Sequence, residues 1–294
     1  RILHTGVRTT KGVVGYDLTR LIIGSEGTLA VITEATLKLT PLPRSRRTLQ
    51  AIYADMHSAA AAVSAIMAQP VTPSALEFMD GPSLQMVRNY ADPGLPAAAG
   101  ALLMIELEEH EAAMEAAVQA VQEAARVPGC LALETATSEE QVAKLWKTRK
   151  ALSPALRNVA PKKINEDVVV PVSAIPTLIT ELGRLAERHA ITIVNFGHAG
   201  NGNIHVNLLI DPDDPRQMRA ANACLDEVFD LVLHLGGTLS GEHGIGLVKR
   251  AFVDREIDQP TLALMHAIKR QFDPCGILNP DKGFPNPERE EIQP

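Results

Sequence analysis

Two of the nine histidines stand in a glycine-rich segment whose spacing could bring them together. The segment runs from Gly197 to His205, between two stretches of strand-like composition, ITIVNF and NIHVNLLI. Three glycines in six positions let the backbone turn sharply, because they lack a Cβ. Such a hairpin can place His198 and His205 together near its base, where two imidazoles suit a divalent transition metal. The alternative is a hairpin whose histidines only form hydrogen bonds, and the spacing does not decide between the two.

A second glycine-rich segment, Gly236 to Gly246, places a carboxylate and an imidazole next to each other. Adjacent side chains in extended backbone point in opposite directions, so the two need not share one function. Glu242 could complete a His/His/Glu metal site with an open coordination position, which a hydroxy acid could fill. His243 could then act as the general base. The glycines do not form a dinucleotide-binding fingerprint, since that motif follows a strand and opens a helix.

Arg149, in KLWKTRK, is the candidate for binding a substrate carboxylate, because a guanidinium group can grip a carboxylate with two parallel hydrogen bonds. The alternative is a solvated arginine on the surface of a helix. Lys162 and Lys163 precede INEDVVVP, and they either add positive charge to the same pocket or form a surface pair. The remaining histidines have no informative neighbours: His4, His57, His110, His189, His234 and His266.

The elements that must position these residues alternate between strand and helix from about residue 48 onward. Ser138, followed by two glutamates, is typical of a helix start, and Pro154 is expected to kink or end that helix. Single helices between strands predict an α+β fold, an antiparallel-rich sheet with helices on one face. Strands are predicted over residues 48–56, 75–79, 102–108, 132–137, 167–172, 191–196 and 203–210, and further helices over 57–67, 84–90, 111–126, 175–189, 215–235 and 260–272.

Residues 1–43 have the composition of short strands and turns. TEATLKL alternates Ala35, Leu37 and Leu39 with polar residues, which is the pattern of a half-buried strand. The segment is too short to bury its own apolar face, so we interpret it as the last strands of a sheet whose other members are missing. Two prolines and three arginines over residues 41–47 mark a boundary.

Length, composition and charge limit the class of protein. The 294 residues correspond to about two domains, and 46% hydrophobic with 21% charged residues excludes disorder for most of the chain. The net charge of −7 leaves no basic surplus for nucleic acid. No apolar run reaches the roughly 18–20 residues of a membrane span, so we expect a cytoplasmic protein, with peripheral membrane attachment left open for the full-length protein. Three distant cysteines without a CxxC motif predict neither a disulfide framework nor a zinc ribbon.

Four motifs resemble a known family of flavoproteins. GYDLTRLIIGSEGTLAVITEATLKL is similar to the end of the flavin-binding domain of the vanillyl-alcohol-oxidase-like flavoproteins. FGHAGNGNIHVN, SGEHGIGLVKR and FDPCGILNPDKGFP resemble the C-terminal domain of the FAD-linked oxidases, the group of D-lactate dehydrogenase, the glycolate oxidase subunit and D-2-hydroxyglutarate dehydrogenase. The resemblance extends from residue 15 to 285 and implies FAD, a substrate domain that caps the flavin, and oxidation of a D-2-hydroxy acid to a 2-oxo acid.

The resemblance also implies roles for individual residues. His198, His205 and Glu242 resemble metal ligands, with zinc expected first and manganese or iron as alternatives. His243 resembles the base that removes the hydroxyl proton, and Arg149 resembles the arginine that binds the substrate carboxylate. The positions that resemble flavin contacts are Gly24, Ser25, Glu26, Gly27, Ile32 and Asn279.

Two positions depart from the family pattern. Asn201 stands where many members have aspartate, and Asn165 falls near the place where some members carry a lysine. A substrate with a second carboxylate, such as 2-hydroxyglutarate, is therefore less well served, and we expect D-lactate or a similar small monocarboxylate. A metal-dependent hydrolase and a non-catalytic subunit of a flavoprotein complex are the alternative functions.

The resemblance predicts a remnant of the FAD-binding domain over residues 1–44, a substrate-binding cap domain over 45–285 and a tail over 286–294. Arg1 would then mark a cut through the flavin domain, and we expect 1–294 alone to bind FAD weakly or not at all and to be inactive. The electron acceptor is left open between a quinone, a cytochrome and an electron-transfer flavoprotein. No nucleic-acid partner is expected, and a homodimer is left open.

Overall fold

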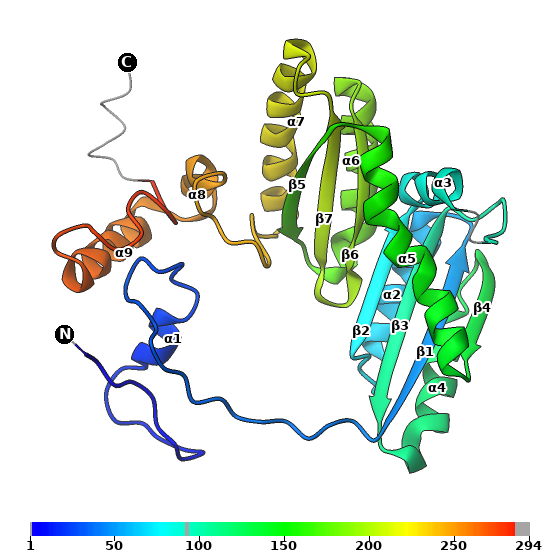
Figure 1. Cartoon of the computed structure of the whole chain (residues 1–294), viewed down its shortest axis with the longest axis horizontal. Helices are drawn as coiled ribbons and strands as arrows, with labels where there is room; N and C mark the ends of the chain where they lie inside the picture. The colour runs from blue at the N-terminus through cyan, green and yellow to red at the C-terminus, as the bar shows by residue number, and fades with distance from the viewer. Residues whose placement is uncertain (1, 92–93, 286–294) are drawn as a thin grey trace. The chain divides into compact units, whose positions relative to one another are not determined.

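The computed structural model describes residues 2–91 and 94–285, which form two compact units (Figure 1). The sheet unit is Thr40–Gly241, and the described parts of the terminal unit are residues 2–39 and 242–285. The tail expected over 286–294 lies outside the described residues. The domain boundaries expected at residues 44 and 285 stay predictions.

The sheet unit is built on one antiparallel sheet. Among its described residues, seven strands form the order β4-β1-β3-β2-β6-β7-β5, and every neighbouring pair is antiparallel. The strands are β1 (Ser45–Tyr53), β2 (Ala75–Asp80), β3 (Ala101–Glu109), β4 (Cys130–Ala136), β5 (Lys162–Val169), β6 (Thr192–His198) and β7 (Asn203–Ile210). The α+β class and the antiparallel-rich sheet predicted from the sequence are confirmed.

Helices cover both faces of this sheet. They are α2 (Met56–Ala68), α3 (Gly81–Tyr90), α4 (Glu111–Ala125), α5 (Glu139–Val159), α6 (Ile175–His189) and α7 (Pro215–His234). Tyr53 of β1 donates a hydrogen bond to a carbonyl of α4 at 2.9 Å, whereas Gln50, three positions earlier, donates to a carbonyl of α5 at 3.4 Å. Because successive strand side chains alternate between faces, α4 and α5 lie on opposite faces. Figure 1 shows α5 crossing the sheet in front.

The second helical layer differs from the single layer that we expected. Central strands are buried on both faces, so one layer of helices would leave Ile52, Met79 and Met104 in water. These side chains pack in one cluster with Leu152 and Leu156 of α5. Pro154 does not end α5, which extends to Val159, because the apolar side chains around the proline are held in this cluster.

The terminal unit contains helices and loops. Its helices are α1 (Leu18–Ile22), α8 (Val253–Glu256) and α9 (Gln259–Phe272). None of its described residues is in a strand, so the strand expected over TEATLKL is wrong. A strand requires hydrogen bonds from a neighbouring strand, and the described residues of this unit offer none. Leu37 and Leu39 are accordingly exposed.

Two further expectations concern the whole described chain. The three cysteines, Cys130, Cys224 and Cys275, form no disulfide, as predicted. Among residues 2–91 and 94–285, no helix combines the length and hydropathy that crossing a bilayer requires.

Candidate functional site

The β6–β7 hairpin brings the two predicted histidines together. Its register places Phe196 opposite His205 and His198 opposite Asn203, so the two imidazoles lie on the same face of the sheet. Their ring centroids are 5.4 Å apart, with the ring planes at 82°, and their ligand nitrogens lie within 4.8 Å of one another. The convergence predicted from the spacing is confirmed.

Gly202 closes the turn of this hairpin. Its φ is +74°, and a Cβ at this position would lie 1.9 Å from the carbonyl oxygen of Val170. The positive φ strains any residue with a side chain, and a Cβ would fit only if the backbone shifted. The glycine therefore fixes the turn between the strands that carry His198 and His205.

Glu77 is a central residue of the site that the sequence analysis missed. It lies in β2 directly opposite His198 of β6, and its side chain is buried. One carboxylate oxygen bonds Nδ1 of His198, and the other accepts a hydrogen bond from Nη2 of Arg149 at 3.3 Å. The residues are 121 and 72 positions apart, so the sheet register and helix α5 create this contact.

Arg149 and Lys163 lie at the same aromatic ring. The guanidinium carbon of Arg149 is 4.8 Å from the ring centroid of Phe196, and Nζ of Lys163 is 5.9 Å from it. Partial burial, together with Arg157 and Arg149, lowers the pKa of Lys163. Nε of Arg149 is buried and has no hydrogen-bond partner in the described structure. The arginine therefore keeps donor capacity beyond its bond to Glu77. Lys162 is exposed.

Asp167 of β5 fixes the segment that leads to Glu242 and His243. It accepts hydrogen bonds from Oγ of Ser240 at 3.1 Å, from the backbone N–H of Gly241 at 2.8 Å, and from Nδ2 of Asn203. Just before these residues, Thr238 forms an antiparallel bridge with β5. The path of the chain is thus fixed up to Gly241, the residue before Glu242.

In the terminal unit, three sequence motifs meet. Both carboxylate oxygens of Glu26, in GSEGT, accept backbone hydrogen bonds, from Ile245 at 2.7 Å and from Gly246 at 2.8 Å. Nδ2 of Asn279, in LNPDK, donates to the carbonyl of Glu26. The carboxylate of Glu26, which we expected at the flavin, thus supports the loop that follows His243.

A partly buried lysine, Lys269, anchors the same motifs. Nζ of Lys269 in α9 donates to the carbonyls of Thr28 at 2.7 Å and Leu278 at 2.8 Å, and it pairs with Asp273. The hydrogen bond from Lys269 lowers the pKa of Asp273 to about 2. Among the other positions that resemble flavin contacts, Ser25 accepts a backbone hydrogen bond from Thr28, Gly24 and Gly27 have positive φ, and Ile32 is exposed.

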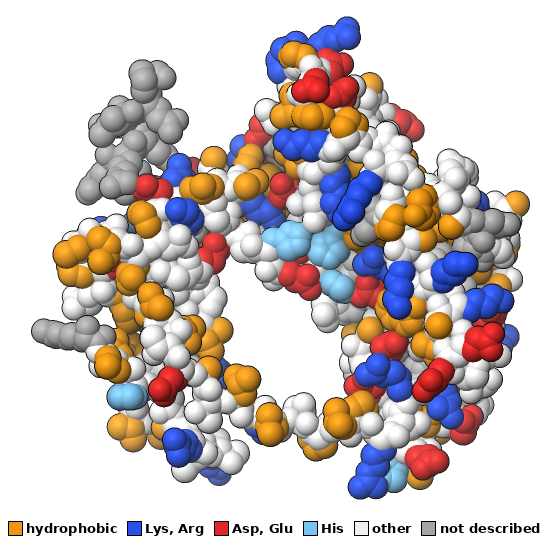
Figure 2. Space-filling view, viewed as in Figure 1, with side chains coloured by type: hydrophobic (Ala, Val, Ile, Leu, Met, Phe, Trp, Pro, Cys, Tyr) orange, Lys and Arg blue, Asp and Glu red, His pale blue; other side chains and the backbone are white. Residues whose placement is uncertain are grey.

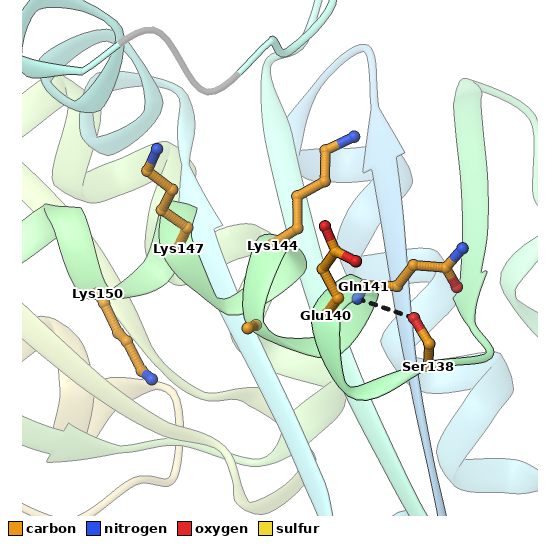
Figure 3. A pocket seen from close by; sticks show the side chains of 7 residues that line it. Ser138, Glu140, Gln141, Lys144, Lys147 and Lys150 are labelled. Atoms are coloured by element: carbon orange, nitrogen blue, oxygen red, sulfur yellow. Dashed lines mark hydrogen bonds between the residues drawn. The ribbon is translucent and has the colours of Figure 1, made fainter.

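A surface hollow on the sheet unit lies away from these residues. It has a volume of about 670 Å³ and is lined by the N-terminal half of α5, including Lys144, Lys147 and Lys150. Figure 3 shows these lysines extending from α5 in different directions, and Ser138 accepting the hydrogen bond that begins the helix. No predicted site residue lines this hollow.

The residues of the hairpin fit a divalent metal ion. Two imidazoles at this separation supply nitrogen ligands, and the bond from Nδ1 of His198 to Glu77 is the carboxylate–histidine arrangement that orients metal ligands. Figure 2 shows histidine side chains gathered beside acidic and basic ones. The loops of the terminal unit supply backbone turns with positive φ, which allow close approach of a large cofactor.

Comparison with known proteins gives three results. Residues 42–283 match the model of the family described as FAD linked oxidases, C-terminal domain. The glycolate oxidase subunit GlcD of Bacillus subtilis is 37% identical over 291 residues, which cover 99% of this chain and 62% of that protein. The D-lactate dehydrogenase of Archaeoglobus fulgidus is 34% identical over 285 residues, 96% of this chain and 61% of that protein.

A solved structure supports the fold. The 4-ethylphenol oxidase from Gulosibacter chungangensis superposes with a TM-score of 0.71 at 16% identity, covering 95% of this chain and 61% of that one. The chain thus spans about six tenths of the length of these relatives. The family resemblance predicted from the four motifs is confirmed.

Proposed function

Because the chain belongs to the family of FAD-linked oxidase C-terminal domains, we propose that it supplies the substrate site of a flavoenzyme that oxidises a D-2-hydroxy acid to the 2-oxo acid. The observation that carries this proposal is the group formed by Glu77, His198, His205 and Arg149. The group combines nitrogen ligands for a metal ion with a guanidinium group that has further hydrogen-bond donors. A 2-hydroxy carboxylate requires both, the metal ion for its hydroxyl group and the guanidinium for its carboxylate.

Each part of the substrate has a proposed partner. Arg149 binds the carboxylate through the donors that Glu77 leaves available. His198, His205 and Glu242 would hold a divalent ion, which would supply the Lewis acidity that lowers the pKa of a bound hydroxyl group. His243 takes the hydroxyl proton. FAD would supply the two-electron acceptor for the α-hydrogen and its electron pair, so the hydroxy acid would lose one hydride to the flavin and one proton to His243.

We propose that the cofactor contacts come from the terminal unit. Gly24, Ser25, Gly27 and Asn279 lie in loops that Lys269 and Glu26 hold together, which supports a role for these loops at the flavin. Zinc is the first candidate for the metal, and the donor set also suits manganese or iron.

The names of the relatives support a small monocarboxylate as substrate, with glycolate and D-lactate as the first candidates. Lys163, beside Arg149 at the ring of Phe196, adds positive charge for the carboxylate. The word subunit in one relative's name supports assembly with a partner protein.

The test is the effect of His205→Ala and Arg149→Lys on the full-length, flavin-loaded protein. We expect His205→Ala to abolish stoichiometric metal binding, and Arg149→Lys to raise KM for D-lactate by about 10-fold or more, since lysine cannot form the bidentate contact. His57→Ala, at an exposed histidine, is the control and should change neither quantity. Unchanged metal content in His205→Ala, or an unchanged KM in Arg149→Lys, would contradict the assignment.

A further inference from the structure

We propose that Glu77 is a positioning residue that couples the metal site to the substrate-binding arginine. The proposal rests on the proposed function of His198 and Arg149. It assigns a task to a residue that lies in neither glycine-rich motif and that would touch neither metal nor substrate.

The two oxygens of Glu77 are divided between two functional groups. Oε1 contacts Nδ1 of His198, and Oε2 contacts Nη2 of Arg149. The side chain of Glu77 is only 9% exposed and that of Arg149 is 19% exposed, so water competes little for these contacts. A shift of the carboxylate toward one partner must therefore weaken its contact with the other.

The backbone of Glu77 is held on both sides. It pairs with Met104 of β3 and with His198 of β6, and the next two residues of its strand, Phe78 and Met79, are fully buried. The carboxylate therefore starts from a fixed point of the sheet. This rigidity is what a residue that positions others must have.

For His198, the contact selects which ring nitrogen meets the metal. With Nδ1 engaged by a carboxylate, Nε2 becomes the ligand atom, and the negative charge behind the ring increases its basicity. Loss of such a carboxylate partner typically weakens metal binding by 10- to 100-fold.

For Arg149, the contact fixes the plane of the guanidinium group. One edge is held by Glu77, and one face lies 4.8 Å from the ring centroid of Phe196. These two restraints leave the guanidinium donors that Glu77 does not engage to bind an anion. An arginine prepared in this way loses less conformational entropy when a carboxylate binds.

A shared carboxylate makes the two sites interdependent. A metal ion that orders His198 also orders Glu77, and through it Arg149, so metal and substrate should strengthen each other's binding by the same factor. Replacement of Glu77 should weaken this coupling, so that only the part from direct contact between the substrate hydroxyl and the ion remains.

The experiment compares Glu77→Gln with Glu106→Gln. Glu106 lies on the neighbouring strand β3 and bonds Trp146 of α5, so it offers the same chemical change at a helix-facing position outside the site. Mn²⁺ and Zn²⁺ are titrated calorimetrically into the full chain, with and without D-lactate. We expect about 10- to 100-fold weaker metal binding in Glu77→Gln, a smaller effect of D-lactate on the metal affinity than in wild type, and a change in metal affinity of less than twofold in Glu106→Gln. Equal affinities in the two variants would overturn the proposal.

A second variant covers the case in which Glu77→Gln does not fold. Glu77→Asp keeps the charge but is one methylene shorter, so it cannot reach both partners. We expect it to retain the wild-type melting temperature within a few degrees and to lose metal affinity or raise KM for D-lactate on the order of 10-fold. Wild-type values for both would overturn the role of Glu77.

The outcomes separate this inference from the proposed function. If wild-type protein oxidises D-lactate and binds metal, but Glu77→Gln matches Glu106→Gln, only the coupling role fails. If Glu77→Gln weakens metal binding while the wild-type flavin is not reduced by any hydroxy acid, the positioning role at His198 is supported and the proposed reaction fails. Absence of metal binding in the wild type overturns the coupling.

Discussion

Replacement of Asp167 by asparagine should destabilise the sheet unit strongly, although only one heavy atom changes in kind. Asp167 is fully buried and accepts hydrogen bonds from Asn203, Ser240 and the backbone of Gly241. Hydrogen bonds to a charged acceptor contribute about 1.5–3 kcal/mol each. Asparagine keeps one carbonyl oxygen, and its NH₂ group must face at least one of these donors. We therefore expect a loss of about 3 kcal/mol in the free energy of unfolding.

The assay is urea unfolding followed by circular dichroism, with Asp213→Asn as the control. Asp213 is exposed, so its replacement should stay within about 0.5 kcal/mol of wild type. With a slope of about 3 kcal/mol per molar urea, Asp167→Asn should lower the midpoint by about 1 M. A midpoint that equals that of Asp213→Asn would refute the reasoning that Asp167 holds the segment before Glu242.

Two other perturbations test the packing of the sheet unit. Burial raises the pKa of Asp80 to about 6, so the folded state binds more protons than the unfolded state between about pH 4 and 6. This group therefore contributes about 3 kcal/mol to the free energy of unfolding below pH 4, and the contribution is lost as the pH rises through 6. Asp80→Asn should remove this pH dependence. Parallel profiles of stability against pH in the two proteins would contradict the expectation. Gly202→Ala should lower the free energy of unfolding by more than about 2 kcal/mol, because its Cβ would overlap the Val170 carbonyl. Gly183→Ala should instead raise the free energy of unfolding by about 0.5–1 kcal/mol, because Gly183 lies within α6 and has open space around it. Thermal melting of the two variants checks this opposition, and shifts of the same sign would contradict it.

Local sequence patterns predicted most elements of the sheet unit. The helix over residues 175–189 agrees with α6 at both ends, because apolar residues recur at helical spacing and a proline stands in its first turn. The strand over 203–210 agrees with β7 for a comparable reason, a run of strand-forming residues after a glycine turn. In contrast, TEATLKL has the alternation of a strand without a neighbour to pair with, and alternation alone cannot supply one.

In the candidate site, too, local contacts could be predicted and long-range contacts could not. His198 and His205 could be predicted to converge, because one short hairpin contains both. The contact between Glu77 and His198 could not be predicted, because it depends on β2 and β6 being neighbours in the sheet. The residues around Glu77 have only the pattern of an ordinary buried strand. Glu26 was recognised in its motif, but its bonds to Ile245 and Gly246 join segments about 220 residues apart. Long-range pairings of this kind are absent from local sequence patterns.

The central claim is oxidation of a D-2-hydroxy acid with His243 as the base. The most direct measurement is anaerobic bleaching of the flavin in the full-length protein by D-lactate, L-lactate and glycolate, in wild type and in His243→Ala. We predict rapid bleaching of the wild type by D-lactate or glycolate, little by L-lactate, and a rate about 10²–10⁴-fold lower in His243→Ala. A wild-type flavin that no hydroxy acid reduces, or a variant that is reduced at the wild-type rate, would contradict the account.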